Sequence, residues 1–527
     1  MKSLMKKVFA AAAAIATVFG LAATTVATAN AADNATLTVS TTDAKFASKT
    51  VNAYKMFSAT VSGDGKAVSY TLTDEWKPFF KNSVGLTGVT DENVNDKAND
   101  YVSKLKDSTL VAFATKASNW AQTKANNITA DATATVSADA SNGKYTATFT
   151  GLGYGYYVVA VPGATLANAK SQYATLVSVH STKVDADIKG DLPTVDKKVQ
   201  VDGTGKDATD AKIGDTLTFT LTSTIPDMSA YDTYTFNFKD TLSKGLTFGQ
   251  VKSVKVENVT LTENTDYTVT TPTASNNNTL TVAMKDFKTK QQANAGKKIT
   301  VTYTATLNEN AVVGGAGNVN SAKIQYSNNP STNGTGESEP SKVRVFTYGF
   351  TVDKYTGDYG ENATRLAGAE FTLAHKDGSA ISFVQVSAGS ATANAVYRVA
   401  KAGETGTTTI TTPANGKVVF EGLKNGEYTL TETKAPAGYN KLASAIGVKV
   451  NGQNNGTDTT NATVTITYNN DNGNDYNQTA SNGVIPVQNK SGAILPGTGG
   501  MGTIAFTVIG VLVIALGVAW TLKRKNA

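Results

Sequence analysis

The tetrapeptide Thr-Val-Asp-Lys occurs twice in this chain, at Thr194–Lys197 and at Thr351–Lys354. In an extended strand, every second side chain lies on the same face. The side chains that share a face with each lysine are apolar: Val195 and Val199 with Lys197, and Phe350 and Val352 with Lys354. Because a charged ammonium is very costly to bury in an apolar core, we expect each lysine to be neutral, paired or chemically altered.

Alternating runs of the same kind occur along the chain and predict β-strands. Leu217, Phe219 and Leu221 alternate with threonine, as in a half-buried strand. Thr, Asn, Ala, Gly and Val dominate the composition, and turn residues are frequent between the short runs. The sequence therefore predicts an all-β fold of tandem sandwich-like domains.

We expect three domains, at residues 32–190, 191–343 and 344–490. About 460 residues remain between the two terminal segments described below, and this length suits three domains. The first domain differs from the others between Asp74 and Asn127, where aromatic and apolar residues are spaced as in short helices. We interpret this stretch as a helical insertion packed on a β core.

Both ends of the chain carry segments with a recognisable pattern. Residues 1–31 begin with lysines, continue with an apolar stretch and end with small residues, which is typical of a secretory signal peptide. Residues 491–527 contain a pentapeptide of the form LPxTG, an apolar run at 504–522 and a basic tail. The run is about 20 residues long, as a transmembrane helix requires, and the tail should stay on the cytoplasmic side. The pentapeptide consists of Leu495, Pro496, Gly497, Thr498 and Gly499.

An LPxTG motif ahead of an apolar run and a basic tail resembles the cell-wall sorting signal of Gram-positive surface proteins. In that family a sortase cysteine attacks the threonine carbonyl, so the resemblance implies cleavage between Thr498 and Gly499. An amine from a peptidoglycan precursor or from another protein then resolves the acyl-enzyme. The resemblance implies a secreted protein, anchored to the cell wall of a Gram-positive bacterium.

Composition excludes several classes of site. The chain has no cysteine, two histidines and a formal net charge of +6. A secreted chain without cysteine has no disulfides, and these residues leave little for a metal site. So small a charge on 527 residues does not indicate nucleic-acid binding. We expect no cofactor, no metal and no nucleic acid. Because no Ser/His/Asp set is visible, we also expect no enzyme that acts on an external substrate.

The strand-face argument also finds acids and amides in phase with apolar residues. They are Asp240 after Tyr234, Phe236 and Phe238; Glu432 after Tyr428 and Leu430; Asn320 before Ala322 and Ile324; and Asn489 after Ile485 and Val487. Asn318 and Asn328 share the phase of Asn320. Lys198 is the alternative to Lys197, so both choices stay open in the second domain.

A lysine, a carboxylic acid and an asparagine in one apolar core are the groups of an intramolecular isopeptide bond. Burial lowers the pKa of a lysine and raises that of a carboxylic acid. The neutral amine can then attack the asparagine carbonyl while the protonated acid polarises it, and ammonia leaves. The alternative is a buried Lys–carboxylate pair beside a satisfied asparagine.

Two runs in the third domain, Leu366–Leu373 and Tyr428–Tyr439, resemble the B-type repeat domains of Gram-positive collagen adhesins and pilins. The second run corresponds to the E-box of that family. Together with the sorting signal, these runs resemble sortase-assembled pilus backbone subunits, the major fimbrial pilins. The resemblance implies immunoglobulin-like sandwiches of the collagen-adhesin A and B types.

The same resemblance implies two isopeptide bonds. These are Lys197–Asn320, promoted by Asp240, and Lys354–Asn489, promoted by Glu432. The motif Gly151–Tyr157 of the first domain repeats the pattern of Gly422–Tyr428, but four residues beyond Tyr157 the chain has Val161 rather than an acid. We therefore predict that the first domain forms no such bond.

Polymerisation in this family needs an exposed acceptor lysine near the end of the first domain, commonly within Tyr-Pro-Lys, which is absent here. Val184, Ala186 and Ile188 share a face. Lys189 is therefore expected to point outward, and Lys183 is the alternative acceptor. The resemblance implies that the sorting-motif threonine of one subunit is joined to this lysine of the next.

The sequence thus predicts a structural backbone subunit of a covalent surface pilus. The implied partners are a pilus-specific sortase, a housekeeping sortase, other copies of the chain, tip or base pilins, and peptidoglycan. The alternative is a monomeric wall-anchored adhesin that binds host surface glycans or matrix proteins. Such an adhesin needs the same terminal signals but no acceptor lysine.

Overall fold

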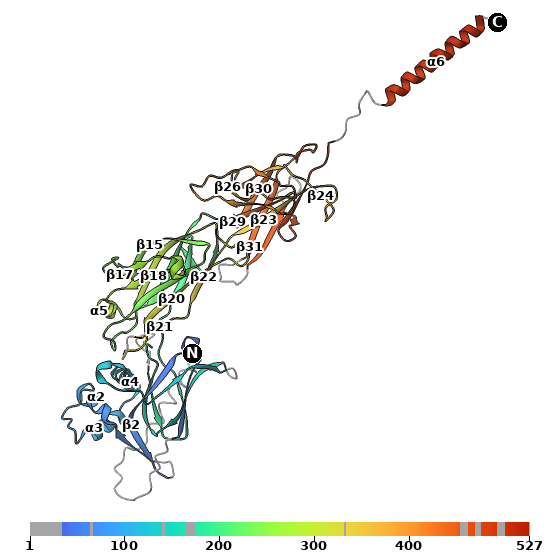
Figure 1. Cartoon of the computed structure of the whole chain (residues 1–527). Coiled ribbons are helices and arrows are strands. Elements are labelled where there is room, and N and C mark those ends of the chain that lie inside the picture. Colours follow the sequence, from blue (N-terminus) through green and yellow to red (C-terminus); the bar gives the residue numbers. More distant parts are fainter. Residues whose placement is uncertain are drawn as a thin grey trace.

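The computed structural model describes residues 34–63, 67–139, 143–164, 174–330, 334–453, 462–469, 476–492 and 501–525. β-Strands are the main regular structure of the described chain, in three domains that follow one another along an elongated molecule (Figure 1). The expected all-β fold of tandem sandwich domains is confirmed. The expected signal peptide at 1–31 and the LPxTG motif at 495–499 lie outside the described residues.

A C-terminal helix, α6 (Met501–Lys525), lies beyond the third domain (Figure 1). It covers the expected membrane span at residues 504–522. Among the residues that the structure describes, however, no helix is long and apolar enough to cross a membrane. The expected transmembrane helix is therefore not borne out.

The first domain is built from two sheets. Its strands are β1 (Ala35–Thr41), β2 (Thr50–Val61), β3 (Val68–Leu72), β4 (Ala132–Thr135), β5 (Ser137–Asp139), β6 (Lys144–Leu152), β7 (Gly155–Ala160), β8 (Ala174–Val179) and β9 (Lys183–Asp187), with a short helix η2 (Ala44–Phe46). One sheet has the order β5-β6-β1-β9, in which β1 and β9 run parallel. The other has the order β3-β2-β7-β8, with β4 beside β2.

The stretch between β3 and β4 is helical, as expected for residues 74–127. Its helices are η3 (Asp74–Trp76), α2 (Lys77–Asn82), α3 (Val94–Ser103), α4 (Asp107–Gln122) and η4 (Lys124–Asn126). Trp76, Phe79 and Phe80 are fully buried in an apolar cluster between this segment and the sheet. Phe80 packs edge-on against Phe57 of β2, with ring centroids 5.8 Å apart. The helical insertion is confirmed.

Two sheets also form the second domain. Its elements are β10 (Asp196–Val201), β11 (Thr204–Lys206), β12 (Ala208–Asp210), β13 (Thr216–Thr224), β14 (Phe236–Leu242), β15 (Leu246–Val256), β16 (Val259–Thr260), β17 (Tyr267–Thr270), η5 (Ala274–Asn276), β18 (Thr279–Met284), α5 (Phe287–Gln291), η6 (Gln292–Asn294), β19 (Lys298–Leu307), β20 (Asn318–Ser327), β21 (Thr335–Glu337) and β22 (Ser341–Phe346). One sheet has the order β11-β10-β13-β19-β15-β16. The other has the order β12-β22-β20-β14-β18-β17, with β21 beside β20.

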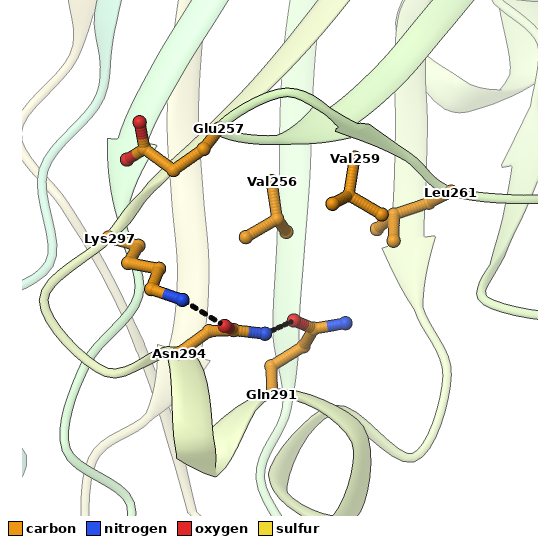
Figure 2. Close-up of a pocket in the computed structure, with 7 residues that line it drawn as sticks. All are labelled: Val256, Glu257, Val259, Leu261, Gln291, Asn294 and Lys297. Carbon is orange, nitrogen blue, oxygen red and sulfur yellow. Dashed lines mark hydrogen bonds between the residues drawn. The ribbon is translucent and has the colours of Figure 1, made fainter.

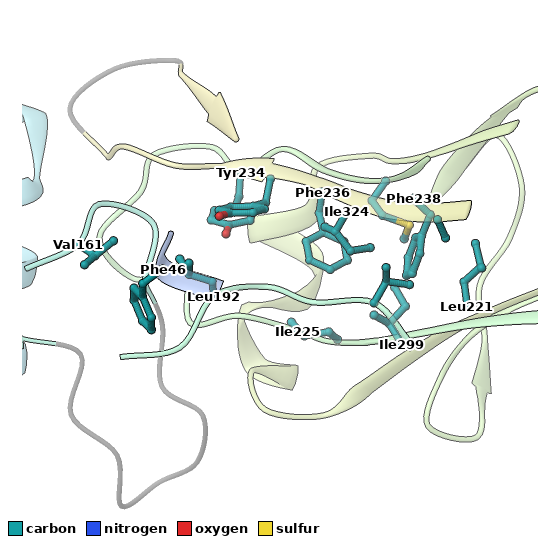
Figure 3. Packing of buried hydrophobic residues seen from close by; sticks show 14 of the residues in the cluster. Phe46, Val161, Leu192, Leu221, Ile225, Tyr234, Phe236, Phe238, Ile299 and Ile324 are labelled. Carbon is teal, nitrogen blue, oxygen red and sulfur yellow. The ribbon is translucent and has the colours of Figure 1, made fainter. Parts of the chain in front are cut away.

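Apolar side chains from both of these sheets fill the space between them. Figure 3 shows Phe238 and Ile324 across from Ile299 of the facing sheet. The same buried cluster extends into the first domain through residues such as Phe46 and Val161. Any polar side chain on an inward strand position of the second domain therefore enters a dry, close-packed interior.

The third domain repeats the two-sheet plan. Its strands are β23 (Tyr348–Thr356), β24 (Thr364–Arg365), β25 (Glu370–His375), β26 (Phe383–Ser387), β27 (Ala395–Val399), β28 (Ile410–Thr411), β29 (Lys417–Leu423), β30 (Gly426–Lys434), β31 (Ile446–Gln453), β32 (Thr463–Tyr468), β33 (Gln478–Thr479) and β34 (Val484–Gln488). One sheet has the order β24-β23-β29-β27-β26, with β34 parallel to β23. The other has the order β28-β25-β30-β31-β32-β33.

The sheets place the boundary between the second and third domains later than expected. Strand β22 spans the expected division between residues 343 and 344, and it pairs with β20 of the second domain. The sheets separate at Thr347, between β22 and β23. The polar stretch at 327–341 therefore connects strands within one domain, because β22 after it pairs with β20 before it.

The second and third domains meet at a tightly packed junction. Ile213 N donates to the carbonyl of Gly422 at 3.0 Å, and Asn425 N donates to Asp210 Oδ2 at 2.7 Å. Ile213 also belongs to the buried apolar cluster of the third domain. Gly422 has φ +84°, and a Cβ there would lie 2.7 Å from Ile213 Cδ1, so glycine is what permits this approach.

A methyl group at Gly452 should destabilise the third domain. A Cβ at this position of β31 would lie 2.0 Å from Cζ of Tyr348, whose ring is fully buried. Because such overpacking costs about 1–3 kcal/mol, Gly452→Ala should lower the midpoint of chemical denaturation. Gly360→Ala is the control, since nothing lies within 4 Å of a Cβ there. Equal midpoints for the two variants would contradict the expected steric conflict.

Candidate functional site

Four buried polar side chains meet between the two sheets of the second domain. Lys197 of β10 and Tyr303 of β19 come from one sheet, and Asp240 of β14 and Asn320 of β20 come from the other. Each of the four is 0% exposed. The structure therefore brings together the lysine, acid and amide expected from the sequence, and a tyrosine joins them.

Hydrogen bonds connect these four groups through the hydroxyl of Tyr303. Lys197 Nζ donates to Tyr303 Oη at 2.9 Å, and Asn320 Nδ2 donates to it at 2.6 Å. Tyr303 Oη in turn donates to Asp240 Oδ2 at 2.7 Å. Lys197 Nζ also forms an ion pair with Asp240 Oδ2. The amine, the acid and the amide nitrogen thus all contact one oxygen atom.

Burial sets the charge state of Lys197. Its Nζ lies 5.1 Å from the ring centroids of both Phe219 and Tyr303, in an apolar setting. Burial lowers the pKa of Lys197 to about 8, although the charge and hydrogen bond of Asp240 oppose this shift. This shift favours the neutral amine, the form of lysine that can attack a carbonyl.

Two oxygen atoms of this cluster have no hydrogen-bond partner among the described residues: Asp240 Oδ1 and Asn320 Oδ1. Buried polar atoms are nearly always paired. A proton on Asp240 Oδ1 would make that atom a donor, and Asn320 Oδ1 has acceptor capacity to spare. A hydrogen bond from a protonated Asp240 to Asn320 Oδ1 would use both atoms and polarise the amide carbonyl.

A second buried cluster lies in the third domain, with Lys354 on β23, Glu432 on β30 and Asn489 just after β34. Lys354 Nζ is 2.9 Å from Glu432 Oε1, and Asn489 Nδ2 donates to Glu432 Oε2 at 3.0 Å. The backbone N–H of Leu442 donates to the same Oε2 at 2.7 Å. The structure therefore also brings together the second expected set.

Strand pairing holds the lysine and the asparagine of this cluster side by side. In the parallel pair of β23 and β34, Lys354 lies opposite Val487. Asn489 N donates to the carbonyl of Tyr355 at 3.0 Å, which continues the pairing by one step. Burial lowers the pKa of Lys354, and the hydrogen bond and charge of Glu432 oppose this shift.

The sequence alternatives in the second domain lie outside the cluster. Asn318 is buried, but its side chain is engaged with backbone groups of a neighbouring loop and strand. Asn328 follows β20 and is half-buried. The side chain of Lys198 is 32% exposed and pairs with Asp207 at 2.5 Å. The geometry therefore places Lys197 and Asn320 in the cluster rather than these alternatives.

The first domain shares a local motif with the third but lacks its acid. Tyr157 and Tyr428 each donate through Oη to the carbonyl four residues earlier, both at 2.6 Å. Val161, which corresponds in spacing to Glu432, is buried. In the described part of the first domain, no Lys, Asp or Glu is buried. That this domain forms no isopeptide bond stays a prediction.

The two candidate acceptor lysines lie at the end of the first domain. Lys189 follows β9, its side chain is 30% exposed, and its Nζ pairs with Asp187 Oδ2 at 3.0 Å. Lys183, the first residue of β9, is exposed. Solvent reaches both, so the choice between them stays open.

A small pocket of about 140 Å³ opens between the β15–β16 turn and the α5–η6 segment of the second domain (Figure 2). On one side Lys297 Nζ donates to Asn294 Oδ1, and Asn294 Nδ2 donates to Gln291 Oε1. Sites for drug-sized ligands have volumes of about 300–1,000 Å³. The pocket is too small for such a ligand, and no residue of either cluster lines it.

The strand pattern alone does not single out Tyr303. It lies on the inward face of β19, where its neighbours on the same face are also buried: Ile299, Val301, Ala305 and Leu307. A tyrosine in such a series is read as a core aromatic. The signal that marks it is its hydroxyl, because a buried tyrosine O–H needs a polar partner.

Two stretches of the chain match domain families. Residues 213–330 match the model of the Gram-positive pilin backbone subunit 2, a Cna-B-like domain. Residues 356–465 match the model of the prealbumin-like fold domain. Each stretch contains the acid of its cluster, Asp240 or Glu432.

Solved structures of two pilins align with most of the chain. The T6 backbone pilin of serotype M6 Streptococcus pyogenes covers 80% of this chain and 83% of its own, with 20% identity and a TM-score of 0.45. The full-length major pilin SpaD of Corynebacterium diphtheriae covers 77% of this chain and 88% of its own, with 20% identity and a TM-score of 0.38.

A curated relative matches part of the chain. The trypsin-resistant surface T6 protein of Streptococcus pyogenes serotype M6 is 26% identical over 278 residues, which is 48% of this chain. The chain spans 44% of that relative's length. Over the matched residues the chain is therefore similar to Gram-positive backbone pilins.

Proposed function

We propose that this protein is a backbone subunit of a covalently polymerised surface pilus of a Gram-positive bacterium. The observation that carries the proposal is the pair of buried Lys–acid–Asn clusters, one in each of the two domains that match known families. A shaft subunit transmits tension along its length. Internal covalent bonds at these clusters would keep its domains folded under that tension.

In each cluster the lysine passes a proton to the neighbouring carboxylate, and the neutral amine attacks Cγ of the asparagine. The new N–C bond forms as the carbonyl electrons move onto Oδ1, which the protonated acid stabilises. The Cγ–Nδ2 bond then breaks. Overall, a lysine ammonium and an asparagine amide give an isopeptide bond and an ammonium ion, and no other reactant is needed.

Joining of subunits is the second part of the proposal. A pilus-specific sortase captures the carbonyl of Thr498, and Lys189 or Lys183 of the next copy attacks the acyl-enzyme. A housekeeping sortase joins the last subunit to peptidoglycan and so anchors the pilus to the cell wall. This part rests on the sequence of the LPxTG motif and on the solvent-accessible lysines after and within β9.

The purified protein should weigh less than its processed sequence by two ammonia units, one for each cluster. Intact-mass spectrometry measures the deficit. Tryptic digestion should yield branched peptides that join Lys197 to Asn320 and Lys354 to Asn489. A mass equal to that of the sequence would refute the cross-links, and a deficit of three units would contradict the prediction for the first domain.

Removal of each acid should abolish one bond only. Asp240→Ala should lose the bond of the second domain, and Glu432→Ala that of the third. Each bond closes a loop of more than 100 residues, so by analogy with disulfides its loss should lower the unfolding free energy by about 4–5 kcal/mol. Lys198→Ala, which changes the partly exposed neighbour of Lys197, is the control and should keep both bonds. Both bonds intact in the Asp240→Ala protein would exclude this acid from the reaction.

Polymerisation should depend on one lysine at the end of the first domain. In cells with the cognate sortase, the wild-type protein should form a ladder that survives boiling in detergent, and Lys189→Ala should abolish it. Lys183→Ala should leave the ladder intact, and the reverse pattern would assign the acceptor role to Lys183. A wild-type protein that never forms a ladder would favour the monomeric adhesin instead.

A further inference from the structure

We propose that Tyr303 is a catalytic residue of the second-domain cross-link, and that its hydroxyl delivers a proton from Asp240 to the leaving nitrogen of Asn320. This inference rests on the proposed formation of a Lys197–Asn320 bond. It concerns how the reaction is completed, because the amide nitrogen must gain a proton before it can leave.

Every hydrogen-bonding position of the Tyr303 hydroxyl is used by one of the reacting groups. It accepts from Lys197 Nζ at 2.9 Å and from Asn320 Nδ2 at 2.6 Å, and it donates to Asp240 Oδ2 at 2.7 Å. A tyrosine hydroxyl has one donor and two acceptor lone pairs. All three are used here, and each contacts the nucleophile, the leaving group or the acid.

Packing fixes the ring of Tyr303 in this position. The ring stacks on Phe219 with centroids 5.3 Å apart and an interplanar angle of 18°. Phe248 lies on another side, with centroids 6.1 Å apart. The side chain is fully buried, so the hydroxyl cannot turn away to solvent. Burial and the negative charge of Asp240 hold the pKa of Tyr303 well above its usual value, so the hydroxyl stays protonated and able to donate.

The proton balance of the reaction requires such a group. Lys197 first gives one proton to Asp240, and its neutral amine attacks Cγ of Asn320. In the resulting tetrahedral species, Nδ2 has become a basic amine while Nζ carries an extra proton. Asp240 donates its proton to Tyr303 Oη as Tyr303 donates its own proton to Nδ2. Asp240 then takes the surplus proton from Nζ, the Cγ–Nδ2 bond breaks with its electron pair going to nitrogen, and ammonia leaves.

In the third-domain cluster, no tyrosine is needed to bring a proton to the leaving nitrogen. There Asn489 Nδ2 donates directly to Glu432 Oε2 at 3.0 Å, so the acid itself touches the leaving nitrogen. In the second domain, the side-chain partner of Asn320 Nδ2 among the described residues is Tyr303 rather than Asp240. In the second domain, the hydroxyl of Tyr303 therefore connects the acid to the leaving nitrogen by hydrogen bonds.

The test is Tyr303→Phe in the full chain, which removes the hydroxyl and keeps the ring that stacks on Phe219. The protein is synthesised in a cell-free reaction, translation is stopped, and intact mass is followed over time. Because general acid–base groups contribute about 10²–10⁴-fold, the ammonia loss of the second domain should slow at least tenfold. The third-domain bond in the same molecule should form at the wild-type rate. Equal second-domain rates for variant and wild type would overturn the inference.

Two controls separate chemistry from packing and from the proposed function. Phe219→Leu disturbs the stacked ring but keeps the hydroxyl, so it should form the bond within a few-fold of the wild-type rate. Equal slowing by Phe219→Leu and Tyr303→Phe would assign the effect to packing and overturn the catalytic role. Solvent D₂O should slow second-domain bond formation in the wild type more than in Tyr303→Phe, and an unchanged isotope effect would also overturn it. A wild-type protein that loses no ammonia would refute the cross-link itself, whatever Tyr303 does.

Discussion

Burial of two lysine side chains is the constraint on which the rest of this structure depends. An ammonium that leaves water for a protein interior loses several kcal/mol of hydration, and a single carboxylate seldom repays that loss in full. Lys197 and Lys354 are both buried, in separate domains. Each lies beside one acid and one asparagine and near an aromatic ring. Well-packed apolar residues at such positions are often as stabilising as a buried ion pair. Two lysines placed in the same kind of cluster therefore fit a chemical use better than a purely stabilising one.

The two clusters occupy different places in their sandwiches. In the second domain, Lys197 and Asn320 come from opposite sheets, so a bond between them would fasten one sheet to the other across the core. Strands β21 and β22 still follow Asn320, so such a bond would not end at the last strand of the domain. In the third domain, Lys354 and Asn489 belong to the first and last strands of one sheet or directly follow them, and the acid reaches them from the facing sheet.

Strand alternation marked the lysines, acids and amides as candidates that face the core, but it left Asn318, Asn328 and Lys198 open as alternatives. It could not find Tyr303, since an aromatic residue on an inward face is indistinguishable from ordinary core until its strand is placed opposite Asp240. The same limit explains why the expected domain boundary at 343/344 lies too early. Composition marks 327–341 as polar, but only the pairing of β22 with β20 shows that the second domain continues beyond it. The helical insertion of the first domain followed from local spacing, so its presence was accessible from the sequence.

The parallel pairing of β23 and β34 determines how the third domain meets a pulling force. A force along the chain would enter at the beginning of β23 and leave at the end of β34, and these points lie at opposite ends of the paired strands. The strands are therefore loaded in shear, so their hydrogen bonds resist together instead of unzipping one after another. An antiparallel pair pulled from its two adjacent ends would peel open from one side. The topology of this domain thus offers mechanical resistance of its own, independent of the proposed covalent bond.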